Sequence, residues 1–289
     1  MRMFDDISSL RAYVRGMRAE GKRIGFVPTM GALHEGHLSL IKKAKADCEI
    51  SIASIFVNPT QFGPNEDYER YPRTLSKDQN LTSTVGLDAM FLPDVQEMYP
   101  GGYQTSVRVH EVTRRLEGEV RPGHFDGVAT VVLKLMNIVM PDRCYFGQKD
   151  YQQAAMIQRM VRDLNAACEV VVLPTIRDTD GLALSSRNAY LTPDQRAAAP
   201  VLYRALTLAK QLADAGETSA AAIQSAMCQL LAQEPLAEPE YVDVAHAETL
   251  NPLETIENTP AVALLAVKVG TTRLIDNILL GNTKPFATR

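Results

Sequence analysis

The chain has 289 residues, 46% of them hydrophobic, which is enough apolar material for a large core and for two domains. The formal net charge of −4 gives no electrostatic reason to expect nucleic acid as the main partner. Lys134 interrupts the most apolar stretch, the start of the chain does not resemble a signal peptide, and the four cysteines are far apart, so we expect a cytoplasmic protein with reduced thiols and no membrane partner.

Strand-like and helix-like segments alternate through the first part of the chain. Short apolar runs predict buried strands at 23–28, 50–58, 88–93, 143–147 and 168–174. Apolar residues at helical spacing predict helices at 37–46, 126–140 and 150–164, the second of which ends before Pro141. Strands that alternate with helices form right-handed βαβ units. The pattern therefore predicts an α/β fold with a Rossmann-like, doubly wound parallel sheet.

The pattern changes near residue 180. The segment Thr192-Pro193-Asp194-Gln195 predicts the start of a helix that runs to about Ala213, because Thr is a good cap and Pro is favoured in the first turn. A second helix is expected at 218–233, followed by strands at 240–246, 262–269 and 273–280. We expect a Rossmann-like domain at residues 1–178 and a smaller α+β C-terminal lid domain at residues 179–289.

Polar or glycine-bearing loops follow the predicted strands. They are 28-PTMGALHEGH-37, 58-NPTQFG-63, 147-GQKD-150 and 175-TIRDTDGLALSSRN-188. Because ligands of doubly wound sheets bind outside the carboxyl ends of the strands, these loops hold the candidate site residues.

His34 and His37 have three possible interpretations: a zinc site, histidines on a helix surface, or a phosphate-binding loop. The zinc motif HExxH has its histidines four residues apart, whereas here the spacing is three and no cysteine is nearby. The start of a helix offers N–H groups and a positive dipole to a phosphate, and Gly31 and Gly36 would allow close approach. The position of the two histidines favours the phosphate-binding interpretation.

Two further loops carry cations. Lys149 is unfavourable beside the positive end of a helix dipole unless an anion binds there, although Asp150 offsets part of that cost. Ser185, Ser186 and Arg187 suit a second phosphate clamp, but a polar surface loop has the same residue types.

Neutral amides and one more loop complete the candidates. Gln61 and Gln153 could hydrogen-bond a hydroxyl or a carboxylate without adding charge. Arg121 and His124 either touch substrate or cap the helix that follows them.

Five stretches taken together identify a family. They are VPTMGALHEGHLSLI, FVNPTQFGPNEDYERYPRT, EGEVRPGHFDGVATVVLKL, FGQKDYQQ and DGLALSSRNAYLTPDQR. These stretches resemble the pantoate–β-alanine ligases, also called pantothenate synthetases, and the resemblance is densest up to about residue 200. HEGH resembles the His-x-Gly-His signature of adenylate-forming and nucleotidyl-transferring Rossmann proteins.

The resemblance implies a two-step reaction. ATP and (R)-pantoate give pantoyl adenylate and pyrophosphate, and β-alanine then attacks the adenylate to give pantothenate and AMP. It also implies Mg²⁺ with ATP and a homodimer. A nucleotidyltransferase of the same superfamily is the alternative enzyme, and a nucleotide-binding regulator is not excluded by fold. A dinucleotide-binding dehydrogenase is disfavoured because the first loop lacks GxGxxG.

The resemblance further implies roles for individual residues. The implied catalytic residues are His34, His37 (the proton donor), Lys149, Ser185, Ser186 and Arg187. The implied ATP contacts are Met30, Gly31, Ala32, Leu33, His34, Glu35, Gly36, His37, Gly147, Gln148, Lys149, Asp150, Ile176, Leu184, Ser185, Ser186 and Arg187. Gln61 and Gln153 are expected to hold pantoate, Gln61 also β-alanine, and Asp78 is associated with magnesium.

Overall fold

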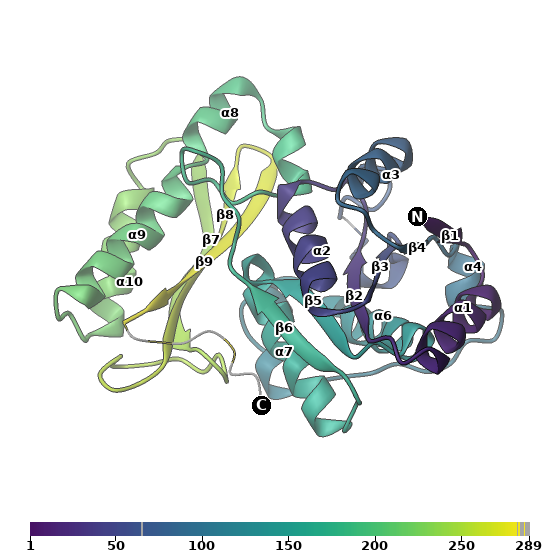
Figure 1. Cartoon of the computed structure of the whole chain (residues 1–289). Helices are drawn as coiled ribbons and strands as arrows, with labels where there is room; N and C mark the ends of the chain where they lie inside the picture. The colour runs from purple at the N-terminus through teal and green to yellow at the C-terminus, as the bar shows by residue number, and fades with distance from the viewer. Residues whose placement is uncertain (65, 282, 284–285, 287–289) are drawn as a thin grey trace. The chain divides into compact units, whose positions relative to one another are not determined.

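The computed structural model describes residues 1–64, 66–281, 283 and 286 (Figure 1). The chain forms two compact units. Of the described residues, the first unit contains Met1–Gly147 and Met156–Leu173, and the second contains Gln148–Ala155 and those from Pro174 onward. The segment Gln148–Ala155 belongs to the second unit by its contacts, whereas the sequence pattern assigns it to the first. The expected boundary between residues 178 and 179 stays a prediction.

The first unit contains a six-stranded sheet in which neighbouring strands are parallel and follow the order β1-β4-β3-β2-β5-β6. The strands are β1 (Arg2–Phe4), β2 (Ile24–Thr29), β3 (Ile50–Ile55), β4 (Ala89–Phe91), β5 (Arg143–Gly147) and β6 (Glu169–Leu173). The doubly wound parallel sheet is therefore confirmed. β2 and β5 meet where the strand order reverses, which is the usual ligand-binding point of such sheets.

Strands β2 and β3 are apolar along their length because helices cover the sheet. Phe26, Val27, Ile52 and Ala53 are all fully buried. Helix α2 packs on β2, β3 and β5, and a Cβ atom added at Gly25 would lie 3.1 Å from that of Ala44 in this helix. The close approach explains a glycine inside a central strand.

The first unit also contains the helices α1 to α6 and part of α7. They are α1 (Ile7–Ala19), α2 (Glu35–Asp47), α3 (Leu75–Thr84), α4 (Val95–Met98), α5 (Glu117–Val120) and α6 (His124–Val139), and α7 (Tyr151–Asp163) runs from the second unit into the first. The short 3-10 helices η1 (Pro59–Gln61) and η2 (Glu111–Thr113) also belong here. α6 ends at Val139, and its C-terminal cap, Met140, has a left-handed backbone conformation; the sequence predicts an end before Pro141.

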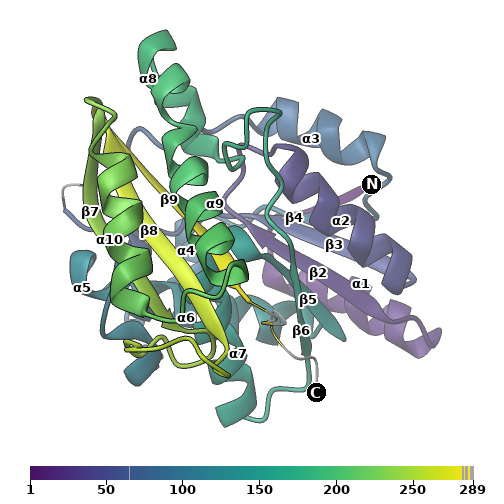
Figure 2. The ribbon, with the colours of Figure 1, turned by 90° about the vertical axis from the view of Figure 1, so that its left-hand side faces the viewer.

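The second unit contains an antiparallel sheet, in the order β7-β8-β9, which is covered by helices (Figure 2). Its strands are β7 (Ala237–His246), β8 (Ala261–Val269) and β9 (Thr272–Leu280), and its helices are α8 (Pro193–Ala198), α9 (Val201–Asp214) and α10 (Ala220–Leu231), with the 3-10 helices η3 (Gln148–Asp150) and η4 (Ser186–Tyr190). Leu206 and Ile223 of the helices share one core with Val244 and Leu265 of the sheet. The α+β prediction is confirmed.

The single helix predicted from Thr192 to Ala213 is wrong in one respect. The structure has two helices, α8 and α9, with Pro200 at the N-terminal cap of the second. Proline has no backbone N–H to continue the helical ladder, so the break falls there. In the described part of the chain, no helix combines the length and the apolar character needed to cross a membrane.

Candidate functional site

The loop after β2 makes a sharp turn that only glycine allows. Thr29 Oγ1 donates to the carbonyl oxygen of Ser54 at 2.7 Å and accepts from the amide of Gly31 at 3.1 Å. Gly31 has a φ of +82°, and an added Cβ would lie 2.9 Å from Cγ2 of Ile55. The turn therefore needs a glycine both for its backbone angle and for space.

His34 and His37 form the N-terminal capping box of α2. His34 Nδ1 accepts from the amide of Gly36 at 3.2 Å, and His37 Nδ1 accepts from the amide of His34 at 3.4 Å. The two ring centroids are 4.2 Å apart. Because both Nδ1 atoms accept, each neutral ring carries its proton on Nε2, which is then a hydrogen-bond donor. Two such donors at a helix start suit an anionic oxygen, and the phosphate-binding interpretation stays a prediction.

Asp78 of α3 holds the same loop from the side. Its Oδ2 accepts from the amide of Ala32 at 3.0 Å, and its Oδ1 accepts from the amide of Leu33 at 2.9 Å and from Thr74 Oγ1 at 3.1 Å. The side chain is 1% exposed. Among the residues that the structure describes, no group of three His, Cys, Asp or Glu side chains is arranged to hold a metal ion. The observed contacts give Asp78 the task of shaping the loop, and its expected association with magnesium stays a prediction.

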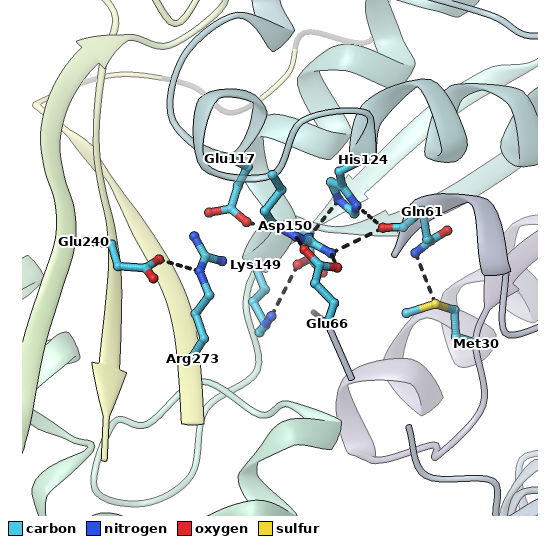
Figure 3. Close-up of polar contacts among 10 residues, drawn as sticks. Met30, Gln61, Glu66, Glu117, His124, Lys149, Asp150, Glu240 and Arg273 are labelled. Carbon is cyan, nitrogen blue, oxygen red and sulfur yellow. Dashed lines mark hydrogen bonds and ion pairs between the residues drawn. The ribbon is translucent and has the colours of Figure 1, made fainter. Parts of the chain in front are cut away.

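Gln61 is a buried amide with one weak partner. Its Oε1 accepts from Asn58 Nδ2 at 3.1 Å, which turns Nε2 toward the thioether sulfur of Met30 at 3.1 Å (Figure 3). A thioether is a weak acceptor, so a hydroxyl or carboxylate oxygen of a ligand would be a stronger partner for this N–H group.

Arg121 and His124 support the backbone of Gln61. His124 Nδ1 donates to the Gln61 carbonyl oxygen at 2.8 Å, and His124 Nε2 accepts from Arg121 Nη1 at 3.0 Å. Arg121 also binds both carboxylate oxygens of Glu66 at 2.6 Å and lies 3.7 Å from Glu117. Figure 3 shows His124, Glu66 and Gln61 in this network. The helix-capping interpretation is wrong, because the cap of α6 is Gly123 and the described residues make no side-chain capping hydrogen bond there.

The charges of this network follow from its contacts. Burial, followed by the Arg121 guanidinium, lowers the pKa of His124 to about 4, so the ring is neutral near pH 7. Burial acts to raise the pKa of Glu66, but the hydrogen bonds from Arg121 hold it below its ordinary value. An ionised Glu66 and a neutral His124 match the donors and acceptors that the geometry requires.

The second unit carries Lys149 in the turn η3. The Lys149 side chain is 19% exposed, and its Nζ lies 3.3 Å from Oδ1 of Asp150 (Figure 3). Gln153 is half-buried two residues inside α7.

The segments around Ile176 and Leu184 pair in the same unit. The amide of Leu184 donates to the carbonyl oxygen of Ile176 at 2.9 Å, and Arg177 pairs with Ala183 in an antiparallel bridge. Ser185 Oγ caps η4 by accepting from the amide of Arg187 at 3.3 Å. The structure thus pairs two predicted ATP-contact segments, around Ile176 and around Leu184, that are not adjacent in the sequence.

The predicted site residues form two groups, one in each unit. The first group is Met30–His37, Gln61, Asp78 and Gly147, and the second is Gln148–Asp150, Gln153, Ile176 and Leu184–Arg187. That both groups bind one ATP molecule stays a prediction.

Sequence reasoning missed Asn58 and Asn277. Asn58 is 1% exposed, and its Oδ1 accepts from the hydroxyl of Tyr99 at 2.8 Å. Asn277 is 2% exposed and lies in β9. The only available signal was their setting: Asn58 directly ends an apolar run, and Asn277 interrupts one.

A doubly wound parallel sheet with a histidine-capped helix after its central strand defines the chain as an α/β protein of the nucleotide-binding class. The family model described as pantoate-beta-alanine ligase matches residues 2–279. The chain belongs to the pantoate-beta-alanine ligase family.

Curated and solved relatives agree with the family match. Pantothenate synthetase of Pelotomaculum thermopropionicum is 55% identical over 281 residues, which cover 97% of this chain and 99% of the relative. The crystal structure of pantothenate synthetase from Thermus thermophilus has a TM-score of 0.91 at 47% identity and covers 96% of this chain and 99% of its own. The pantoate-beta-alanine ligase of Francisella tularensis was solved in complex with beta-gamma ATP and beta-alanine. Its structure has a TM-score of 0.80 at 37% identity, and the match covers 96% of this chain and 97% of that chain.

Proposed function

We propose that this chain condenses (R)-pantoate with β-alanine in an ATP-dependent reaction that passes through pantoyl adenylate and yields pantothenate, AMP and pyrophosphate. Family membership supports this activity. The observation that supports it in the structure is the histidine capping box, in which both Nδ1 atoms accept from the backbone and each neutral ring therefore carries its proton on Nε2 at the start of α2.

The first step needs charge stabilisation more than a protein nucleophile. A carboxylate oxygen of pantoate attacks the α-phosphorus of ATP, the bond from that phosphorus to the bridging oxygen breaks, and pyrophosphate leaves. Negative charge grows on phosphate oxygens, where the donors of His34 and His37 and the N-terminal dipole of α2 would stabilise it. His37, with its proton on Nε2, is the proposed proton donor.

The second unit is proposed to supply the remaining phosphate ligands. Lys149, Ser185, Ser186 and Arg187 offer an ammonium, two hydroxyls and a planar guanidinium for phosphate oxygens. Contacts of ATP with Gly147–Asp150, Ile176 and Leu184 belong to the same proposal.

Gln61 and Gln153 are the proposed ligands of pantoate, and Gln61 also of β-alanine. The Gln61 amide supports this role because it lies near a weak sulfur acceptor and is held by Asn58 and His124. In the second step the β-alanine amine attacks the acyl carbon and AMP leaves.

Magnesium, assembly and location are further parts of the proposal. Mg²⁺ prefers phosphate and water oxygens, so we expect it to enter with ATP. Asp78 is proposed to influence the ion through the loop that it holds, since its own carboxylate is buried. The enzyme is proposed to work as a homodimer in the cytoplasm, and light scattering of the purified chain tests the dimer.

Pyrophosphate release tests the proposed function. ATP with pantoate alone should release pyrophosphate, and added β-alanine should then release AMP and form an amide. A nucleotidyltransferase would instead keep the nucleotide in its product, so AMP that remains attached after β-alanine addition would contradict the ligase. The family match favours the ligase over this alternative.

Two variants test the phosphate ligands. Lys149→Ala and Arg187→Ala should each slow adenylate formation by roughly 10²- to 10³-fold, because each removes one donor to the transition state. An effect confined to amine attack would contradict the assigned roles.

A further inference from the structure

Asn277 of β9 binds the backbone on both sides of Lys149. Its Nδ2 donates to the carbonyl oxygens of Gln148 and Lys149, each at 2.9 Å. Gln148 Nε2 donates back to Asn277 Oδ1 at 3.2 Å. Carbonyl oxygens only accept, so these contacts define which end of the Asn277 amide is the nitrogen.

The two carbonyl groups belong to the peptide planes that flank the Cα atom of Lys149. When both planes are held, φ and ψ of Lys149 are held as well, because peptide groups are planar and only these two torsions join them. The direction in which the lysine side chain leaves the backbone is therefore set by Asn277.

The neighbouring residue in β9 holds a second segment. Asp276 is 4% exposed and accepts from Arg177 Nη2 at 2.9 Å and from Arg177 Nη1. Arg177 also donates to the carbonyl oxygen of Gly181 at 3.1 Å, and its guanidinium lies 4.1 Å from the ring centroid of Tyr203. One strand thus fixes both the turn of Lys149 and the 177–181 segment within the second unit.

We propose that Asn277 is a positioning residue that aims Lys149 for adenylate formation. The proposal rests on the proposed function, in which Lys149 binds the phosphates of ATP. A hydrophobic residue at this position would fill the space but would leave both carbonyl oxygens without this donor, so the turn that carries Lys149 would lose the contacts that hold it.

Asn277→Leu tests the proposal because it removes the donors at similar volume. Pantoate-dependent pyrophosphate release should slow by roughly 10- to 100-fold with a raised KM for ATP, since a small misplacement of a charge-stabilising group has effects of this size. Attack of β-alanine on supplied pantoyl adenylate should stay within about twofold of wild type.

Gln224→Leu is the matched control. Gln224 is a half-buried amide of the same unit, and its Nε2 donates to the carbonyl oxygen of Val242 at 2.7 Å. This variant also replaces a backbone-binding amide with leucine, but both half-reactions should stay within about twofold of wild type.

A double-mutant cycle separates positioning from general structural damage. If Asn277 acts through Lys149, Asn277→Leu should add no further loss of adenylate formation in the Lys149→Ala background. Two outcomes would overturn the inference while leaving the proposed role of Lys149 intact. One is a fully additive loss in the double variant, and the other is unchanged adenylate formation in Asn277→Leu while Lys149→Ala is impaired. An unimpaired Lys149→Ala would instead overturn the proposed role of Lys149, and the inference with it. If Asn277→Leu does not fold, Asn277→Ser, which keeps one hydroxyl donor, gives the same comparison with a smaller expected loss.

Discussion

Asp78 Oδ1 accepts a hydrogen bond at 2.9 Å from the amide of Leu33, a residue 45 positions earlier in the chain. Its other oxygen accepts from Ala32, which has a φ of +50°, an uncommon value for a residue with a side chain. The strained backbone at Ala32 stays in place because a buried carboxylate holds it. The shape of the histidine loop therefore depends on α3 as well as on its own glycines.

Asp78→Asn should disturb this loop without changing side-chain size. One carboxylate oxygen becomes an NH₂ group, which would then face a backbone N–H as a second donor. We expect the free energy of unfolding to fall by about 1–3 kcal/mol and the KM for ATP to rise, because a buried N–H loses its acceptor. Urea unfolding and pyrophosphate release measure the two effects.

Asp163→Asn is the control for this substitution. It removes an exposed ion pair with Arg159 on α7 and should change stability by less than about 1 kcal/mol. If Asp78→Asn instead kept its stability and only raised the Mg²⁺ concentration needed for activity, a direct metal role would replace the loop-holding role.

His34→Asn separates the capping role of His34 from its proposed phosphate contact. Asparagine is a good N-cap and still offers an acceptor to Gly36, but it lacks the Nε2 donor. Stability should stay within about 0.5 kcal/mol of wild type, while adenylate formation slows by roughly 10²- to 10³-fold.

His34→Ala completes the comparison, because it should show the same kinetic loss and also cost about 1 kcal/mol in unfolding free energy. Near-normal pyrophosphate release by His34→Asn would show that the histidine is only a cap.

The elements predicted correctly from sequence are those with an apolar pattern. β2 and β3 are short buried runs, and α6 repeats apolar residues at helical spacing, so both signals are visible in the sequence. Helix α3 was missed because its buried residues, Asp78 and Thr82, are polar and give no hydrophobic repeat. Helix α1 buries only Leu10 and Val14, and β1 has three residues, too few for a reliable signal.

The features of the candidate site also divide into those that the sequence predicts and those that it does not. The histidine loop was predictable because strand ends and helix starts are local features of the sequence. The contacts of Asp78 with Leu33 and of Asn277 with Gln148 join residues 45 and 129 positions apart, and the local sequence does not show which partner either side chain binds. Such contacts become visible only when the tertiary structure is known.

Gly127→Ala should displace the turn that carries Gln61. An added Cβ would lie 2.3 Å from the carbonyl oxygen of Thr60 and 2.7 Å from the amide nitrogen of Gln61. These are backbone atoms, so α6 and η1 would have to separate. We expect a stability loss of at least about 1–3 kcal/mol and a higher KM for pantoate, measured by urea unfolding and by initial rates.

Gly16→Ala is the matched glycine control. Gly16 lies inside α1, and apart from the adjoining helix backbone no atom of the described residues lies within 4 Å of the added Cβ. Alanine should stabilise this helix by about 0.5–1 kcal/mol and leave the KM for pantoate unchanged. Equal effects of the two substitutions would contradict the proposed dependence of Gln61 on the close approach at Gly127.

His124 should make the stability of the protein depend on pH between about 6.5 and 4. Its pKa falls from 6.5 to about 4 in the folded chain, first because burial disfavours the charged ring and then because Arg121 repels it. Across this interval the unfolded chain binds a proton that the folded chain does not, so stability decreases as the pH decreases. The contribution of His124 to the free energy of unfolding is fully present above about pH 6.5 and is lost progressively as the pH falls toward about 4. It amounts to at most about 3 kcal/mol.

His124→Asn provides the reference for this measurement, because asparagine does not titrate and its Nδ2 can still donate to Gln61. Urea unfolding at about pH 7, about pH 5.5 and about pH 4.5 should show the wild-type advantage over His124→Asn shrinking as the pH falls. Carboxylates that lie away from His124 are present in both proteins, and their titration cancels in the difference. A constant difference across the three conditions would mean that the folded and unfolded chains bind the His124 proton equally, which would contradict the lowered pKa of the buried ring.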